Sequence, residues 1–164
     1  MSVTKRPKIA VYTGDVGGGL LTCIKQKPDV IYLSSEGGCL YTMCACIDAL
    51  QEHDCCVIAT GQCFSAAVPI LAVAAKRLAT PRTRFMVHPS SAEMTGIHGK
   101  GEIDAERDEL DWLEQEYLNI LSKCTNHRKN WWRKRIAATT YFGSEEARRH
   151  GVIDQVVYPH VPTM

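Results

Sequence analysis

The stretch Gly61-Gln62-Cys63-Phe64-Ser65-Ala66-Ala67 decides how this chain is interpreted. The apolar run before it, residues 55–59, predicts a buried strand, and the Ala-rich run 65–75 predicts a helix, with Gly61 at the turn between them. Ser65 would then lie where a strand passes into a helix, at the positive end of the helix dipole. The small side chains that follow Ser65 leave room for a substrate carbonyl to approach its hydroxyl.

A second apolar strand is predicted over residues 84–87, and it ends at His88 because Pro89 cannot continue it normally. A serine and a histidine at the ends of neighbouring strands are the nucleophile and the base that acyl transfer needs. The alternative is that Ser65 caps the helix and His88 is an unrelated edge residue, since serine is a frequent N-cap. These two residues alone leave both interpretations open.

A Gly-Gly turn follows a third predicted strand. The run 30–33 predicts this strand, Ser34-Ser35-Glu36-Gly37-Gly38 forms the turn, and residues 40–51 predict the next helix. Paired glycines let the backbone come close to a ligand with its N–H groups exposed. Because the tetrahedral intermediate of acyl transfer needs two such donors, we expect the N–H groups of Gly37 and Ala66 to form an oxyanion hole.

These motifs, taken in order, resemble the ClpP family of proteolytic subunits, the S14 peptidases. The resemblance covers residues 8–157 and uses three further motifs: Thr13-Gly14-Asp15-Val16, Ser144-Glu145-Glu146-Ala147 and Gly151-Val152-Ile153-Asp154. It implies a single α/β domain over residues 1–164, a ClpP/crotonase-like ββα superhelix with a mainly parallel sheet and a projecting handle helix. The chain is compact and divergent for this family, with Glu36 in place of the proline of the family's Ser-Pro-Gly-Gly turn, and a phage-encoded member would fit its size.

The same resemblance implies a serine endopeptidase that cleaves unfolded polypeptides or peptides. Ser65 would be the nucleophile and His88 the general base, and the N–H groups of Gly37 and Ala66 would bind the oxyanion. The family's assembly implies a homo-oligomer of two stacked heptameric rings, served by an AAA+ unfoldase or by Clp subunits of a host. A weakly active or non-catalytic ring subunit is the alternative. A crotonase-type acyl-CoA enzyme shares the strand–turn–helix arrangement but uses no serine nucleophile there.

The acidic member of the family's catalytic triad is missing from its expected place. Counting from the neighbouring motifs leads to Arg135, and no Asp or Glu occurs in residues 117–144. This acid orients the histidine, and its loss costs about ten-thousandfold in turnover in serine proteases. Thr139, Thr140, a backbone carbonyl or water would have to orient His88 instead, or the site would act as a dyad.

The segment 103–123 is acidic and carries apolar residues near helical spacing, namely Leu110, Leu113, Tyr117, Leu118 and Leu121. The resemblance identifies it as the helix of a handle over residues 92–125, preceded by a Gly-rich strand over residues 92–101 that contains His98. We expect the stripe of Leu110, Leu113, Tyr117 and Leu121 to be exposed in a single copy and buried between copies. The alternative is a helix packed on its own core.

Composition fits one globular domain of 164 residues. The net charge of +1 gives no reason to expect nucleic acid, and we interpret the basic segment 127–135 as a helix anchored by its tryptophans. No run approaches the roughly 20 apolar residues of a membrane span and no apolar signal core is present, so we expect a cytoplasmic protein. The eight cysteines lack metal-site spacing and are expected to be small buried hydrophobes, with no metal or cofactor.

Overall fold

Among the residues that the structure describes, a seven-stranded sheet forms the centre of the protein. The computed structural model describes residues 6–91 and 99–158. The series β1-β2-β3-β4-β7 is parallel, whereas β5 pairs in parallel with β3 and antiparallel with β6. The strands are β1 (Ile9–Thr13), β2 (Val30–Ser35), β3 (Cys56–Phe64), β4 (Lys76–Ala79), β5 (Arg84–Val87), β6 (Thr140–Gly143) and β7 (Gln155–Val156). The predicted α/β fold with a mainly parallel sheet is confirmed.

Strand β3 is the branch point of the sheet, because its two halves have different neighbours. Residues 56–59 pair with β2 and β4, and residues 62–64 pair with β5. Gly61 lies between the halves, at a slip in the register, with a left-handed φ of 64° that favours glycine. The predicted end of this strand at residue 59 is therefore wrong. Gly61 bends the strand, and the second half continues because β5 offers it new hydrogen-bonding partners.

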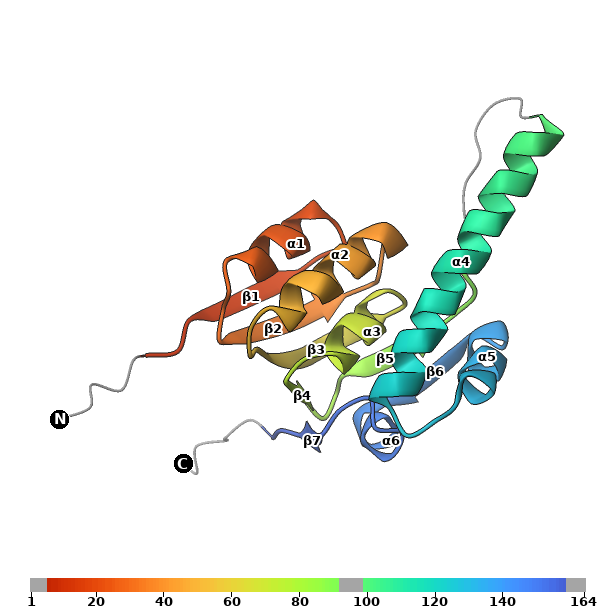
Figure 1. Cartoon of the computed structure of the whole chain (residues 1–164). Coiled ribbons are helices and arrows are strands. Elements are labelled where there is room, and N and C mark those ends of the chain that lie inside the picture. The colour runs from red at the N-terminus through yellow and green to blue at the C-terminus, as the bar shows by residue number, and fades with distance from the viewer. Residues whose placement is uncertain (1–5, 92–98, 159–164) are drawn as a thin grey trace.

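Three helices cover one face of the sheet: α1 (Gly18–Lys25), α2 (Leu40–Gln51) and α3 (Ala67–Ala72), as Figure 1 shows. Helix α2 has its predicted bounds. Helix α3 is shorter than the predicted range 65–75, because the chain turns after Ala72 to enter β4. The core lies between these helices and the sheet, where Leu20, Ile31, Met43 and Ile70 are each at most 1 % exposed.

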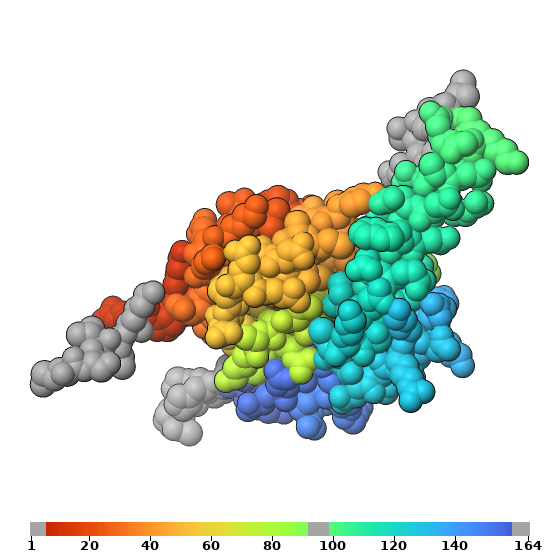
Figure 2. All heavy atoms as spheres, viewed as in Figure 1, coloured from red at the N-terminus to blue at the C-terminus, as the bar shows by residue number. Residues whose placement is uncertain are grey.

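Helix α4 (Lys100–Cys124) projects from the body at its N-terminal end and packs on the body at its C-terminal end (Figures 1 and 2). Leu113, Tyr117 and Leu121 are each at most 5 % exposed, and Leu110 is half-buried. The prediction that this stripe is exposed in a single copy is wrong for the three buried residues, because α3 and α5 cover that end of the helix. The core-packed alternative holds for the C-terminal half.

The predicted handle strand over residues 92–101 falls mostly outside the described residues. Residues 92–98, and His98 with them, are not described, whereas residues 100–101 already belong to α4. The helix begins at Lys100 after the N-cap Gly99, whose N–H donates to Oε2 of Glu102 at 2.9 Å. The last residues of the predicted strand are therefore helical, because this capping bond starts the helix there.

Helix α5 (Lys129–Ala137) is anchored by its tryptophans, as predicted. Trp132 is fully buried, whereas Trp131 stacks on the ring of His127 and lies under the guanidinium of Arg135. The basic side chains Arg133 and Lys134 face solvent. Aromatic burial fixes this helix against the body and leaves its charges hydrated.

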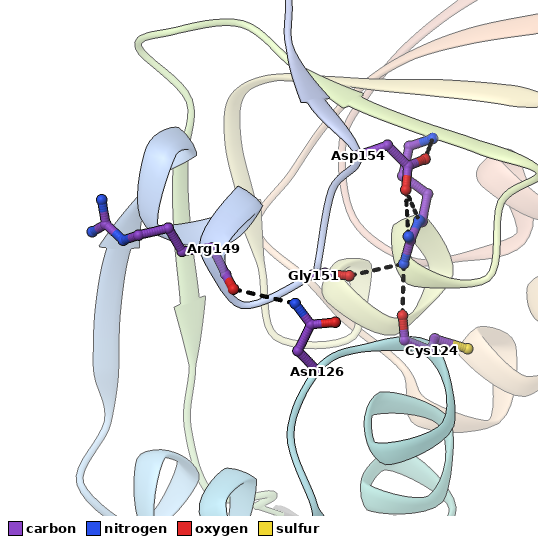
Figure 3. A network of polar contacts seen from close by, with 6 residues as sticks. Cys124, Asn126, Arg149, Gly151 and Asp154 are labelled. Atoms are coloured by element: carbon purple, nitrogen blue, oxygen red, sulfur yellow. Dashed lines mark hydrogen bonds and ion pairs between the residues drawn. The ribbon is translucent and has the colours of Figure 1, made fainter.

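The side chain of Arg77, in β4, bridges the C-terminal end of α4 and the loop between helix α6 (Ser144–Arg149) and β7. Figure 3 labels its partners Cys124, Gly151 and Asp154. The guanidinium of Arg77 donates to the carbonyl oxygens of Cys124 (2.6 Å) and Gly151 (2.8 Å) and pairs with the carboxylate of Asp154. Burial opposes ionisation of Asp154, but the hydrogen bonds and charge of Arg77 outweigh it and lower the pKa of that carboxyl. One side chain thus joins β4, the end of α4 and the loop 151–154, which are distant from one another in sequence.

The cysteines follow the sequence prediction in part. All eight are free thiols, and Cys46, Cys55 and Cys63 are buried as expected of small core residues. Burial raises the pKa of Cys46 to about 11 and that of Cys55 to about 12, so both remain neutral. Cys39 is exposed, so the prediction is wrong for this residue, which stands at the start of α2.

No helix within residues 6–91 and 99–158 is both long enough and apolar enough to span a membrane.

Candidate active site

Ser65 occupies a sharp turn between β3 and α3. Its φ of 51° lies in the left-handed region, which costs a non-glycine residue about 1–2 kcal/mol. The N–H of Ser65 donates to the carbonyl oxygen of Met86 at 2.7 Å. The carbonyl oxygen of Ser65 accepts from the N–H of Val68 at 3.0 Å and from the hydroxyl of Tyr117 at 3.0 Å. Such a strained residue, held from several sides, is typical of a functional site.

The side chain of Ser65 does not cap the helix. The N-cap of α3 is Ala66, and no side-chain capping bond is present there. The Oγ atom of Ser65 lies instead 3.0 Å from Nε2 of His88. The helix-cap alternative is therefore wrong, and the two residues that the sequence singled out are in direct contact.

The sheet explains why His88 reaches Ser65. His88 follows the last residue of β5, and the parallel register pairs Phe64 with Met86. The carboxyl ends of β3 and β5 therefore lie side by side, and the residues just beyond them meet. For the Ser65 hydroxyl to donate to Nε2, the neutral ring of His88 must carry its proton on Nδ1.

No carboxylate orients His88 within residues 6–91 and 99–158: His88 has one hydrogen bond there, the one to Ser65. At the expected place of the acid, Arg135 lies over the ring of Trp131, 4.5 Å from its centroid. The hydroxyl of Thr140 donates to the carbonyl oxygen of Arg135 at 2.8 Å and is engaged there. In the described residues the site is a Ser–His pair.

The Gly-Gly turn approaches Ser65 more closely than any side chain at position 37 would allow. A Cβ atom added to Gly37, whose φ is 99°, would lie 2.6 Å from Cβ of Ser65. The N–H of Gly37 donates to Oγ of Ser35 at 3.2 Å. Within the described residues no acceptor binds the N–H of Gly38 or of Ala66. The turn therefore brings backbone N–H donors close to Ser65, and one of them, the N–H of Gly37, already donates to Ser35.

A groove of about 210 Å³ opens beside the pair. The described residues that line it are Glu36, Gly38, Leu40, Ser65, His88, Ser90 and Ser91. Ser65 and His88 thus face an open space rather than the core, so an extended peptide could lie across them. The lining also includes an exposed carboxylate, which the sequence analysis noted only as a departure from the family's proline.

Two contributions to this site were missed by the sequence analysis. Tyr117 was assigned to an apolar stripe, but its hydroxyl binds the backbone of Ser65, 52 positions earlier in the chain. No local pattern could have identified that contact, because it depends on how α4 packs. The hydrogen bond from Gly37 to Ser35 was also missed, although a serine two residues before a glycine is a common turn signal.

Comparison with known proteins gives the site its context. The family model described as Clp protease matches residues 19–160. The ATP-dependent Clp protease proteolytic subunit 2 of Frankia casuarinae is 31% identical over 154 residues, covering 90% of this chain and 70% of the relative. The ATP-dependent Clp protease proteolytic subunit 1 of Bifidobacterium longum is 30% identical over 154 residues, covering 87% of this chain and 64% of the relative.

A solved structure shows the same fold. A ClpP1 mutant from Listeria monocytogenes matches with a TM-score of 0.81 and 18% identity, over 93% of this chain and 92% of that chain. The family model matches most of the chain, and the fold is similar to that of this solved structure although the two sequences are only 18% identical. The chain therefore belongs to the Clp protease family and is a peptidase of the ClpP proteolytic-subunit type.

Proposed function

We propose that this protein is a serine endopeptidase in which Ser65 is the nucleophile and His88 is the general base. The observation that carries the proposal is the 3.0 Å contact between Oγ of Ser65 and Nε2 of His88, at a turn whose backbone is strained. A hydroxyl in contact with an imidazole can lose its proton as it attacks, which is the requirement for covalent acyl transfer.

The reaction follows from this geometry. Oγ of Ser65 bonds to the carbonyl carbon of the scissile peptide while Nε2 of His88 takes the hydroxyl proton. The tetrahedral intermediate then collapses, the C–N bond breaks, and the leaving amine takes the proton from His88. Water attacks the resulting acyl-enzyme with His88 again as base, and the acid product leaves Ser65 with its hydroxyl restored.

The oxyanion would be bound by backbone N–H groups on both sides of Ser65. Ala66 supplies one donor and Gly37 the other, as the sequence suggested. Gly37 would have to exchange its 3.2 Å bond to Ser35 for the oxyanion, whereas the N–H of Gly38 in the same turn has no such competitor among the described residues. Removing one oxyanion donor in a serine protease costs about 10²–10³ in turnover, so this turn is essential to the proposal.

A Ser–His pair without an acid is expected to be slow. The acid of a triad holds the histidine tautomer and stabilises the imidazolium, and here the described residues offer His88 no such partner. Turnover should therefore lie well below that of a full triad. The competing function is a ring subunit with weak activity or none, and the non-catalytic form predicts no turnover at all.

The larger assembly is also part of the proposal. The membership in the Clp protease family supports a ring assembly that encloses the sites, for which we propose two stacked heptameric rings. It also supports ATP-dependent delivery of unfolded polypeptides by an AAA+ unfoldase or by Clp subunits of a host. A cytoplasmic location remains a prediction from the sequence.

A serine-directed fluorophosphonate probe tests the central claim. The probe should label the wild-type protein, and Ser65→Ala should abolish both labelling and hydrolysis of a fluorogenic peptide while the oligomer remains intact. Ser122→Ala is the matched control, since this serine lies on α4 and donates to the carbonyl oxygen of Asn119. Wild-type labelling in Ser65→Ala would exclude Ser65 as nucleophile, and an unlabelled wild type would favour the non-catalytic subunit.

A further inference from the structure

Among the described residues that line the groove beside Ser65, Glu36 is the one that carries a carboxylate. Apart from His88, the other described residues that line this groove are glycine, leucine and serine. We propose that Glu36 selects substrates that carry a lysine or arginine side chain close to the scissile bond. The inference rests on the proposed peptidase function and names the substrate class of the same site.

The position of Glu36 follows from the turn that contains it. Glu36 comes directly after β2 and directly before Gly37, whose backbone makes the close approach to Ser65 described above. The side chain of Glu36 therefore starts one residue before the glycine that lies against Ser65. A proline at this place would present a neutral ring, whereas this chain presents an exposed carboxylate.

The carboxylate is oriented but not neutralised. Nε2 of Gln62 donates to Oε1 of Glu36 at 3.2 Å, which holds the side chain against the bend of β3. No lysine, arginine or histidine within residues 6–91 and 99–158 forms an ion pair with it. An oriented carboxylate with a free oxygen can accept charge-assisted hydrogen bonds from a substrate cation.

A bound peptide would complete this arrangement. An extended chain lying over Ser65 and His88 passes along the same lining residues as Glu36, so a side chain near the scissile bond meets the carboxylate. The pair is accessible to water and partly screened, so the gain is modest. We expect peptides with lysine there to be cleaved with a kcat/KM about 3- to 10-fold higher than matched peptides with alanine, and with glutamate to be cleaved least.

Substitution of the carboxylate tests the selection directly. Glu36→Gln keeps the shape and the contact to Gln62 but removes the charge, so the preference for lysine over alanine should fall to within about twofold. Glu36→Lys should reverse the order and favour glutamate. Glu52→Gln is the control, since Glu52 pairs with Lys27 at the far end of α2 and should leave the preference unchanged. A preference that survives Glu36→Gln, or its absence in the wild type, would overturn the proposal.

Peptide binding separates this proposal from the peptidase function. Labelled peptides that differ only in one lysine, alanine or glutamate are titrated against Ser65→Ala, and fluorescence anisotropy gives their dissociation constants. Tighter binding of the lysine peptide that is lost in the double variant with Glu36→Gln supports the selection even if the wild type proves inactive. Equal affinities for the three peptides would exclude the selection even if Ser65 reacts with the fluorophosphonate probe.

Discussion

The two halves of α4 differ in nearly every property, although they form one continuous helix. Residues 100–111 carry six acidic and two basic side chains, and all are exposed apart from Asp104 and Leu110, which are half-buried. In the second half, Leu113, Tyr117, Leu118 and Leu121 are each at most 5 % exposed. We refer to these parts as the arm (residues 100–111) and the base (residues 112–124).

Different interactions hold the two parts. In the arm, Arg107 forms exposed ion pairs with Asp104 (3.3 Å) and Asp108 (3.8 Å), and such pairs contribute little in water. The base is held by apolar burial and by the guanidinium of Arg77 on the carbonyl oxygen of Cys124. The base should therefore share the cooperative stability of the core, whereas the arm adds little to it.

The base also supports the candidate active site, which the arm does not. The hydroxyl of Tyr117 donates to the carbonyl oxygen of Ser65, so the base directly contacts the strained turn between β3 and α3. On the arm side, the tyrosine hydroxyl of Tyr41 on α2 donates to Glu109 at the surface. Tyr117 is buried against the backbone of Ser65 and Tyr41 is exposed, which gives a matched pair for experiment.

The largest expected difference between the halves is in packing. Leu121→Ala removes a fully buried side chain and should lower the free energy of unfolding by about 2–5 kcal/mol. Ile103→Ala on the arm removes a side chain that is 48% exposed and should change it by at most about 0.5 kcal/mol. Urea unfolding of both variants measures this. A large loss from Ile103→Ala would show that the arm is packed in solution and would break the comparison.

The next largest difference is in arginine contacts. Arg77→Met removes the donors to Cys124 and Gly151 and leaves the carboxylate of Asp154 unpaired, for an expected loss of about 2–3 kcal/mol. Arg107→Met on the arm removes only exposed pairs and should cost about 0.5 kcal/mol or less. Thermal unfolding distinguishes the two variants. Equal losses of stability in the two variants would mean that the contacts of Arg77 at the end of α4 contribute no more than an exposed ion pair.

The tyrosine pair links the comparison to catalysis. Tyr117→Phe should cost about 1 kcal/mol of stability, because one buried hydrogen bond is lost. It should also lower kcat several-fold at unchanged KM. The turn that positions Ser65 loses a hydrogen bond, whereas the residues that line the groove are unchanged. The rate of fluorophosphonate labelling should fall in parallel. Tyr41→Phe should change neither rate nor stability measurably, and a kcat effect of Tyr41→Phe equal to that of Tyr117→Phe would refute the positioning role.

The sequence predicted those features that depend on local signals. Glycine pairs, the proline after His88 and apolar runs mark where strands end and helices begin, and these signals placed β5 and α2 with their observed bounds. The contact between Ser65 and His88 was also predictable. Residues just beyond the carboxyl ends of neighbouring parallel strands lie close together, whatever the remaining packing.

Features that depend on tertiary packing were not predictable. The glycine at position 61 indicated a turn, but only the pairing of residues 62–64 with β5 shows that β3 continues past it. The apolar stripe of α4 was expected to be covered by a second copy, but α3 and α5 of the same chain cover most of it. Residue spacing gives the apolar face of a helix and not the surface that packs on it. The hydroxyl of Tyr117 had no partner that spacing could identify, because Ser65 lies on a different element.

The smallest expected effect concerns pH and the segment that follows the base. His127, three residues beyond α4, stacks on Trp131, and its Nε2 lies 2.9 Å from Nδ1 of His150. Burial, then the charge of His150, then that of Arg135 lower the pKa of His127. On the other side of the pair, Nε2 of His150 lies 3.4 Å from the carboxylate of Glu146. The protonated form of His127 is thus less favourable in the folded protein than in the unfolded chain.

The sign of the pH effect follows from this lowered pKa. Below the unfolded-state value of about 6.5, the unfolded chain binds a proton at His127 that the folded protein resists. Stability is therefore full above that pH and falls as the pH is lowered toward the folded-state pKa of His127. We expect the urea midpoint of the wild type to drop between pH 7.5 and pH 5.5, and His127→Gln to lose that part of the drop. If His127→Gln has the same pH profile as the wild type, other groups cause the acid sensitivity. The contact between His127 and His150 would then have no part in the pH dependence of stability.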